Sequence, residues 1–321
     1  MDLGIHFRGA GDDILELAAS KKSTYCRFIY HGGVSPAIPL RLAPTWIRVS
    51  GNSQRTVEYC NHRLEYMVTS MQIEVKIISL KNSFEKRAFL SNNIKFSSSM
   101  PWSFFDANTG SDEKSQLVSD HESQRRQFGR CLTKGEIGCF RSHYNLLSQF
   151  LSSGSTDWLL VLEDDVWIDS DFDFQELIDL LEKRSIDYIR LFAKMFKPAD
   201  IVDNLSGFRQ IIRFRTDPYG TQAYLINKRG CDAFLKDIQR ISIPIDDELG
   251  RFWRHKLDPY CVFPFPVVER NTQSSLEKLR NDVLVSRDNS SFVRIRTRIS
   301  DNLRKRASNV GYRYKKALSL F

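Results

Sequence analysis

Three consecutive carboxylates, Glu163, Asp164 and Asp165, follow an apolar run, WLLVL, which predicts a buried strand. Such a cluster is unfavourable, because like charges raise one another's pKa, and sheet stability does not require it. Ligands bind at the carboxyl ends of strands in open α/β sheets. An oxygen-rich cluster there suits Mn²⁺ or Mg²⁺, which would neutralise a diphosphate. The alternatives are an acidic turn that caps a helix, or a metal-dependent hydrolase that uses the same acids.

A second acidic run, Asp246-Asp247-Glu248, lies between IPI and a predicted helix. Taken alone, it is explained by the favourable interaction of acids with a helix N-terminus. Its functional interpretation is a general base, which must reach a hydroxyl. His143 lies on the predicted helix over residues 134–150, where a lone histidine is more often packed than catalytic. The other histidines show no metal-ligand spacing, and the sequence has no nucleophile elbow, P-loop or dinucleotide fingerprint.

Strands and helices alternate from residue 73 onward, which predicts a largely parallel sheet between layers of helices. IEVKIISL, WSFFDA, DWLLVLEDDVWI and TQAYLIN are expected strands, and DELGRFWRHK is an expected helix. The helix TKGEIGCFRSHYNLLSQFLSS should begin with a capping box of Thr133 and Glu136. Residues 107–130 are expected to form a surface loop. Residues 1–72 contain two expected strands, STYCRFIYH and PTWIRVS, a helical stripe over residues 57–71, and no chemical motif.

The 321 residues are 41% hydrophobic and 27% charged, which indicates a globular chain and excludes a mainly disordered one. No stretch approaches the roughly 18 to 20 uncharged apolar residues of a membrane span. The N-terminus lacks the basic start and apolar core of a signal peptide, so secretion by that route is not expected. The six cysteines form no CxxC pair, which argues against a structural zinc site and favours a reducing cytosol.

The net charge of +8 is confined to the C-terminal end. Residues 286–321 hold seven Arg and three Lys against two Asp, so the other 285 residues sum to zero. This pattern predicts a neutral globule with a basic tail and no nucleic-acid partner. Within the tail, one helical face is apolar: Ile299, Leu303, Ala307, Val310, Tyr314 and Leu318. We expect residues 294–321 to bind an anionic membrane surface; the alternative is a helix packed on the domain with its bases solvated.

The motifs IISLKNSFEKR, FFDANTG, LTKGEIGCFRSHYNLL, LLVLEDDV, GTQAYLINKRGCDAFL and PIDDEL occur in this order. Together they resemble glycosyltransferase family 25, of the lipopolysaccharide-biosynthesis β-galactosyltransferase type, which also includes collagen hydroxylysine galactosyltransferases. The resemblance covers about residues 73–270, and KGEIGCFRSH followed by LVLEDDV is its most specific part. Residues 1–72 and the segment VVERNTQSSLEKL depart from the family pattern.

The resemblance implies a type-A glycosyltransferase fold, a Rossmann-like α/β/α sandwich that binds a sugar nucleotide. Residues 73–270 would form this domain, between an N-terminal extension (1–72) and a basic helical tail (271–321). The implied donor is UDP-galactose and the implied product a β-linkage, with Mn²⁺ or Mg²⁺ as cofactor. The acceptor would be a sugar of a lipid-linked lipooligosaccharide core, made at the cytoplasmic face of the cell membrane, where the enzyme would be peripheral.

The resemblance also suggests roles for individual residues. Glu163 and Asp165 would contact the metal, and Asp246 or Asp247 would be the base. Gly220, Thr221 and Tyr224 would lie on the acceptor side. The donor-site candidates are Ser79, Leu80, Arg87, Lys134, Glu136, Ser142, His143 and Asp164. The competing enzyme class is a metal-dependent phosphohydrolase that acts on a nucleotide or sugar phosphate.

Overall fold

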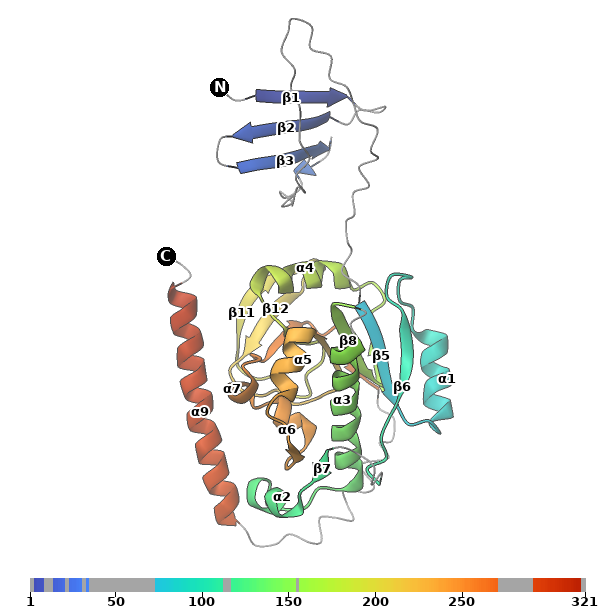
Figure 1. The fold of residues 1–321 in the computed structure, drawn as a ribbon, viewed down its shortest axis with the longest axis vertical. Coiled ribbons are helices and arrows are strands. Elements are labelled where there is room, and N and C mark those ends of the chain that lie inside the picture. Colours follow the sequence, from blue (N-terminus) through green and yellow to red (C-terminus); the bar gives the residue numbers. More distant parts are fainter. Residues whose placement is uncertain are drawn as a thin grey trace, which may run out of the picture. The chain divides into compact units, whose positions relative to one another are not determined.

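The computed structural model divides the chain into two compact units, Met1–Tyr66 and Met67–Phe321. It describes residues 3–8, 14–20, 23–30 and 33–34 of the first unit, and residues 73–111, 117–153, 156–270 and 291–318 of the second (Figure 1). The first unit contains an antiparallel meander of β1 (Leu3–Arg8), β2 (Ile14–Ser20), β3 (Ser23–Tyr30) and β4 (Gly33–Val34). Strand β3 confirms the prediction for STYCRFIYH. The strand predicted at PTWIRVS and the helical stripe over 57–71 lie outside the described residues.

The second unit is built on an eight-stranded sheet in the order β11-β12-β15-β10-β13-β8-β5-β6. Figure 1 shows β8, β5 and β6 side by side at one end of this order. The strands are β5 (Ile73–Ser79), β6 (Trp102–Asp106), β8 (Trp158–Glu163), β10 (Tyr188–Arg190), β11 (Ala199–Asn204), β12 (Gln210–Phe214), β13 (Ala223–Asn227) and β15 (Tyr260–Phe263). Six strands run in one direction, and β12 and β13 are antiparallel to their neighbours. The sheet is therefore mostly parallel in direction, as the alternating sequence pattern predicted.

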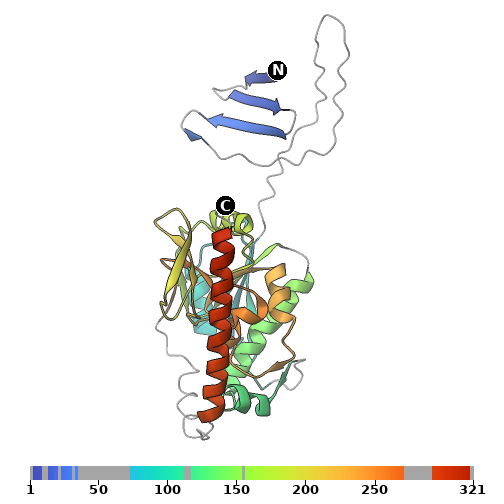
Figure 2. The same cartoon turned by 90° about the vertical axis from the view of Figure 1, so that its left-hand side faces the viewer.

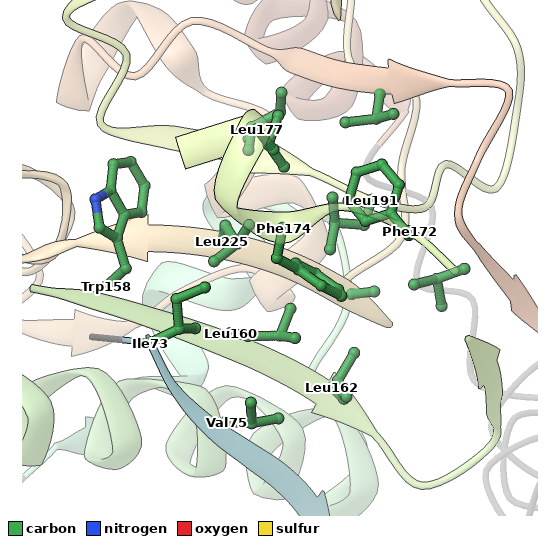
Figure 3. Packing of buried hydrophobic residues seen from close by; sticks show 14 of the residues in the cluster. Ile73, Val75, Trp158, Leu160, Leu162, Phe172, Phe174, Leu177, Leu191 and Leu225 are labelled. Atoms are coloured by element: carbon green, nitrogen blue, oxygen red, sulfur yellow. The ribbon is translucent and has the colours of Figure 1, made fainter. Parts of the chain in front are cut away.

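Helices pack on both faces of this sheet and produce an α/β/α arrangement. Alternate residues of β8 point to opposite faces, so Trp158, Leu160 and Leu162 join one core and Leu159 and Val161 join the other. On the first face these side chains meet α1 (Phe84–Asn93) and α4 (Phe174–Arg184), as Figure 3 shows for the α4 side. On the second face they meet α3 (Lys134–Ser153) and α5 (Lys228–Leu235). Because both faces of β8 are covered, its apolar residues are continuous rather than alternating.

Three predicted elements differ from the structure. Residues 107–130 contain β7 (Val118–Ser119), which pairs with β14 (Arg240–Ile241), and α2 (His121–Gln127), so they are not one loop. The strand expected over DWLLVLEDDVWI turns at Asp164-Asp165 and continues as β9 (Val166–Ile168), which pairs with β16 (Val267–Glu269). The helix expected over DELGRFWRHK is divided near Gly250 into α6 (Ile245–Leu249) and α7 (Phe252–His255). Asp217 lies close against this position and requires a glycine there, because a Cβ on Gly250 would lie 2.1 Å from Asp217 Oδ2.

The basic C-terminal segment forms α9 (Ser291–Leu318), which lies along the second unit in contact with α2 and α7 (Figure 2). Within the described part of the chain, no helix combines the length and the apolarity needed to cross a membrane.

Candidate active site

The first acidic run lies where several strands bring their ends to one edge of the sheet. Strands β5 and β8 are parallel neighbours, and they end at Ser79 and Glu163. Strand β13 runs the other way, so its beginning reaches the same edge, and Glu163 N donates to Gln222 O over 2.8 Å. The sheet therefore brings the predicted Ser79, Thr221 and Glu163 together.

Asp164 is held by a hydroxyl and an ammonium group. Ser79 Oγ donates to its Oδ2 over 2.7 Å, and Lys86 Nζ donates to its Oδ1 over 2.7 Å. Arg87 Nη2 fixes this corner by donating to Ser79 O over 2.7 Å and to Asp106 Oδ1 over 2.6 Å. Lys86 was missed at the sequence level, although three clustered carboxylates need a nearby cation and the motif SFEKR supplies two.

Leu80 contributes to the same corner through its backbone. Its carbonyl accepts from Ser79 Oγ over 3.4 Å and from Ser83 N over 2.9 Å, in the turn that leads into α1. This predicted donor-site residue therefore shapes the loop between β5 and α1.

Glu163 is the end of a buried chain of polar groups. Thr221 Oγ1 donates to Glu163 Oε1 over 2.6 Å, and His143 Nε2 lies 3.4 Å from the same oxygen. His143 Nδ1 is 2.9 Å from the hydroxyl of Tyr224. Burial raises the pKa of Glu163, but His143 and Thr221 outweigh it, so the pKa is lowered. Three residues predicted in separate roles, His143, Thr221 and Tyr224, thus form one network that holds Glu163.

Asp165 differs from its neighbours because its Oδ1 is buried and has no hydrogen-bond partner among the described residues. Its nearest cation, Lys86, lies 4.0 Å from Oδ2. Burial, followed by the charge of Glu163, raises the pKa of Asp165 to about 7. A buried carboxylate oxygen without a donor, beside a second carboxylate, fits a hard divalent cation such as Mn²⁺ or Mg²⁺.

A second set of possible ligands lies beneath Glu163. Donor atoms of Cys139, His143 and Glu163 lie within 4.8 Å of one another in the described structure. This set is softer and suits Zn²⁺ better than Mn²⁺. His143 already has Tyr224 on its other nitrogen, so the geometry is equally that of a histidine positioned against a carboxylate.

The remaining residues of the helix motif lie at the start of α3. The capping box is confirmed: Thr133 N donates to Glu136 Oε2 over 2.9 Å, and Glu136 N donates to Thr133 Oγ1 over 3.1 Å. Arg130 binds both carboxylate oxygens of Glu136, at 2.6 and 2.8 Å. Although predicted for the donor site, Glu136 has its oxygens occupied by the cap, and Lys134 is exposed. Both precede His143 by about two turns of helix.

Ser142 bonds a loop rather than the acidic run. Asn108 N donates to Ser142 Oγ over 2.8 Å, and Ser142 Oγ donates to Gly138 O over 2.7 Å. It therefore anchors the segment that leaves β6 against α3.

Among the described residues, only one acid of the second acidic run, Glu248, forms an ion pair. Glu248 pairs with Arg254 and lies 3.9 Å from Arg251. Asp246 is half-buried, and its buried Oδ1 has no hydrogen-bond partner among the described residues. Burial and then the charge of Glu163 raise the pKa of Asp246. Burial and then the charges of Asp217 and Asp246 raise the pKa of Asp247 to about 6.

The two acidic runs are therefore close enough to interact electrostatically, because the charge of Glu163 raises the pKa of Asp246. A hydrogen bond from Thr221 acts in the opposite direction and lowers it. Buried Arg190 supports the loop between them by donating to Gly220 O and to Asp217 Oδ1, the latter over 3.1 Å. Gly220 has φ +98°, a conformation that suits glycine. Arg190 and Asp217 were missed, although an arginine within the apolar strand DYIRLF must have a buried partner.

These features, a mixed α/β sheet with two acidic runs converging at one edge, agree with the comparisons. A sequence model described as "Glycosyltransferase family 25 (LPS biosynthesis protein)" matches residues 72–249, more than half of the chain. The chain belongs to glycosyltransferase family 25, and the expected family is confirmed.

The curated relatives include members that are named inactive and members that are named procollagen galactosyltransferases. The chain is 34% identical over 147 residues to the human inactive glycosyltransferase 25 family member 3, a match that covers 43% of this chain and 24% of the relative. It is 27% identical over 199 residues to procollagen galactosyltransferase 1-A of Xenopus laevis, covering 58% and 32%. The chain thus spans about a quarter to a third of these relatives.

Among solved structures, A197 from STIV superimposes on 64% of this chain and 97% of its own, with a TM-score of 0.34 and 14% identity. A similarity at that level supports no conclusion about the fold.

Proposed function

We propose that this protein is a β-galactosyltransferase that moves galactose from UDP-galactose to a sugar of a lipooligosaccharide or lipopolysaccharide core, with a β-1,4 linkage as the expected product. The observation that carries the proposal is the convergence of two partly buried acidic runs, in which Asp165 and Asp246 each have one buried oxygen without a hydrogen-bond partner among the described residues. Burying several unpaired carboxylates is costly for folding, so a functional ligand or proton is the reason to keep them.

In the proposed reaction, the acceptor hydroxyl oxygen bonds to C1 of galactose while the bond from C1 to the UDP oxygen breaks. Asp246 or Asp247 takes the hydroxyl proton. Their raised pKa values suit this task, because a stronger base accepts a proton more readily once it is ionised. UDP leaves as an anion, and Lys86 and Arg87 place positive charge at the same edge of the sheet.

Glu163 and Asp165 would hold the divalent cation, Mn²⁺ or Mg²⁺, with Asp165 as the stronger candidate for direct contact. The cation would supply positive charge to stabilise the diphosphate. Thr221 and His143 keep Glu163 in place, and Lys86 keeps Asp164 in place. Asp164 thus belongs to the donor side as an anchored carboxylate. A lipid-linked acceptor would confine the reaction to the inner face of the cell membrane, where the enzyme would be peripheral.

The test is a UDP-release assay with a panel of UDP-sugars and Mn²⁺, with and without core oligosaccharides released from lipooligosaccharide. We expect release to depend on both UDP-galactose and the oligosaccharide, and mass spectrometry to detect one added hexose. Equal release without any acceptor would instead favour the phosphohydrolase. Absence of release from every donor would place this chain with the relatives named inactive.

A further inference from the structure

Helix α9 turns its apolar face away from the domain that it packs against. Six of its apolar side chains are between 53% and 67% exposed, namely Ile295, Ile299, Leu303, Val310, Tyr314 and Leu318. A surface helix of a globular protein ordinarily places such a stripe against the core. The stripe was predicted from its spacing, but the sequence did not show which way it faces.

The opposite face of α9 is polar and holds the helix on the domain. Asn309 accepts from Arg213 Nη1 over 2.8 Å and donates to Arg215 O over 2.7 Å. The Arg213 guanidinium also lies 4.0 Å from the centre of the Tyr312 ring. Further along the helix, Asp301 lies 3.4 Å from Arg251. The helix is therefore docked through its polar residues, and its outward stripe is a fixed surface.

Positive charge surrounds that surface. Residues 291–318 contain nine bases and one acid, Asp301, whose carboxylate faces Arg251 and the domain. Exposed arginines accompany the stripe along its length: Arg296, Arg298, Arg304, Arg306 and Arg313. A second copy of this helix is a poor partner for the stripe, because pairing would bring the exposed arginines of one copy against those of the other.

We propose that the outward face of α9 is a membrane-binding surface, which inserts its apolar stripe into the interface of an anionic lipid bilayer while its arginines contact the headgroups. A helix with an apolar stripe and a cationic border is the combination that such interfaces bind. Because α9 is already helical and docked, binding would hold the domain in one orientation on the membrane. This inference is independent of the proposed transfer reaction.

The experiment is sedimentation of the full chain with vesicles of phosphatidylcholine, with and without phosphatidylglycerol. We expect binding to the anionic vesicles only. The variant Leu303→Glu/Val310→Glu places two acids in the stripe and should lower the partition coefficient on the order of tenfold or more, since each unit charge near the surface counts for about 1 kcal/mol. The matched control is Phe208→Asp/Val118→Glu, which makes the same charge change at apolar residues that are 99% and 64% exposed elsewhere. It should bind nearly as the parent does, and both variants should keep the parental thermal midpoint.

Equal losses in both double variants would show that net charge alone drives binding, and would overturn the assignment of α9. Binding to neutral and anionic vesicles alike would overturn it as well. A parent that binds no vesicles but forms dimers, or captures an acidic protein, would assign the stripe to another partner. UDP release with a soluble acceptor, measured on the same samples, should be equal in all three proteins and separates this outcome from failure of the transfer proposal.

Discussion

The two acidic runs have the same composition, two aspartates and one glutamate, but their surroundings in the structure differ. Glu163-Asp164-Asp165 lies at a strand end, where Lys86, Ser79 and Thr221 bind two of its members. Asp246-Asp247-Glu248 lies at the start of α6, where only Glu248 has an ion-pair partner in the described structure. In each run, one part is held by polar partners and another is partly buried and has a raised pKa.

The second run shows that acids at the start of a helix are not always there to stabilise it. Acids in a first helical turn are stabilising when they remain solvated or bind backbone N–H groups. Helix α6 is only five residues long, and burial raises the pKa of Asp246 and Asp247. The two side chains therefore cost stability when ionised, so stabilisation of the helix start does not explain them.

The largest expected effect is at Asp165. Asp165→Asn should lower turnover on the order of 10³-fold or more, because under the proposed assignment it removes a ligand of the cation, whose charge would contribute several kcal/mol of stabilisation. The thermal midpoint should stay level or rise, since a buried, repelled acid is removed. Asp232→Asn, at an exposed position on α5, is the control and should match the parent. Retained transfer in Asp165→Asn would contradict the metal assignment.

The second run gives the next largest effect. Asp246→Asn and Asp247→Asn should differ from each other, and the catalytic base should lose about 10²-fold or more in turnover. The affinity for the sugar-nucleotide donor, measured by titration calorimetry with the UDP-sugar, should be unchanged in that variant. Similar mild losses of turnover in both variants would show that neither Asp246 nor Asp247 is the general base.

The raised pKa of Asp247 predicts opposite pH effects on activity and stability. If Asp247 is the base, kcat/KM should rise about tenfold per pH unit toward pH 6 and then level off. Between its ordinary value near 4 and about 6, the folded protein holds a proton that the unfolded chain releases, so stability falls as pH rises through this window. Urea titrations of parent and Asp247→Asn at pH 4.5 and 7 should show a smaller decline in the variant. An equal decline in unfolding free energy would show that a group other than Asp247 causes the pH dependence of stability.

The smallest expected effect is on stability and concerns Glu248, the acid of the second run that has an ion-pair partner. Glu248→Ala leaves Arg254 without its buried partner and should cost about 1–2 kcal/mol of unfolding free energy, measured in urea. Glu122→Ala removes an exposed pair with Arg126 and should cost about 0.5 kcal/mol or less. Equal losses of unfolding free energy in the two variants would contradict a stabilising role for the Glu248 ion pair.

Much of the sheet could be predicted because its strands are runs rich in apolar residues and bounded by polar residues. β5, β6 and β8 follow such runs, and the capping box located the start of α3. The short β7, β9 and β14 could not be found this way, because strands of two or three residues carry no period and exist through their partners.

The composition of the site was predictable, but the partners of its side chains were only partly so. The acids could be identified from the sequence, because clustered carboxylates repel one another and sheet stability does not require them. The roles of Lys86, Arg190 and Asp217 depend on contacts between segments that are distant in the sequence. The capping-box spacing predicted the role of Glu136 at the start of the helix, but nothing in the helix motif showed that His143 reaches Glu163. Periodicity predicted the stripe on α9, while its outward direction depends on contacts made by Asn309 and Tyr312.

The order of strands has a consequence for folding rate. Ser79 and Asp164, which share a hydrogen bond at the heart of the site, are 85 positions apart in the chain. The pairing of β5 with β8 must close that loop before any of the acidic edge exists, and contacts of such long range make folding slow. A chain emerging during synthesis therefore cannot assemble the edge until β8 has been made, and β13 must then add on its other side. Helix α3, whose contacts along its own axis are local, is free to form well before the site that it serves.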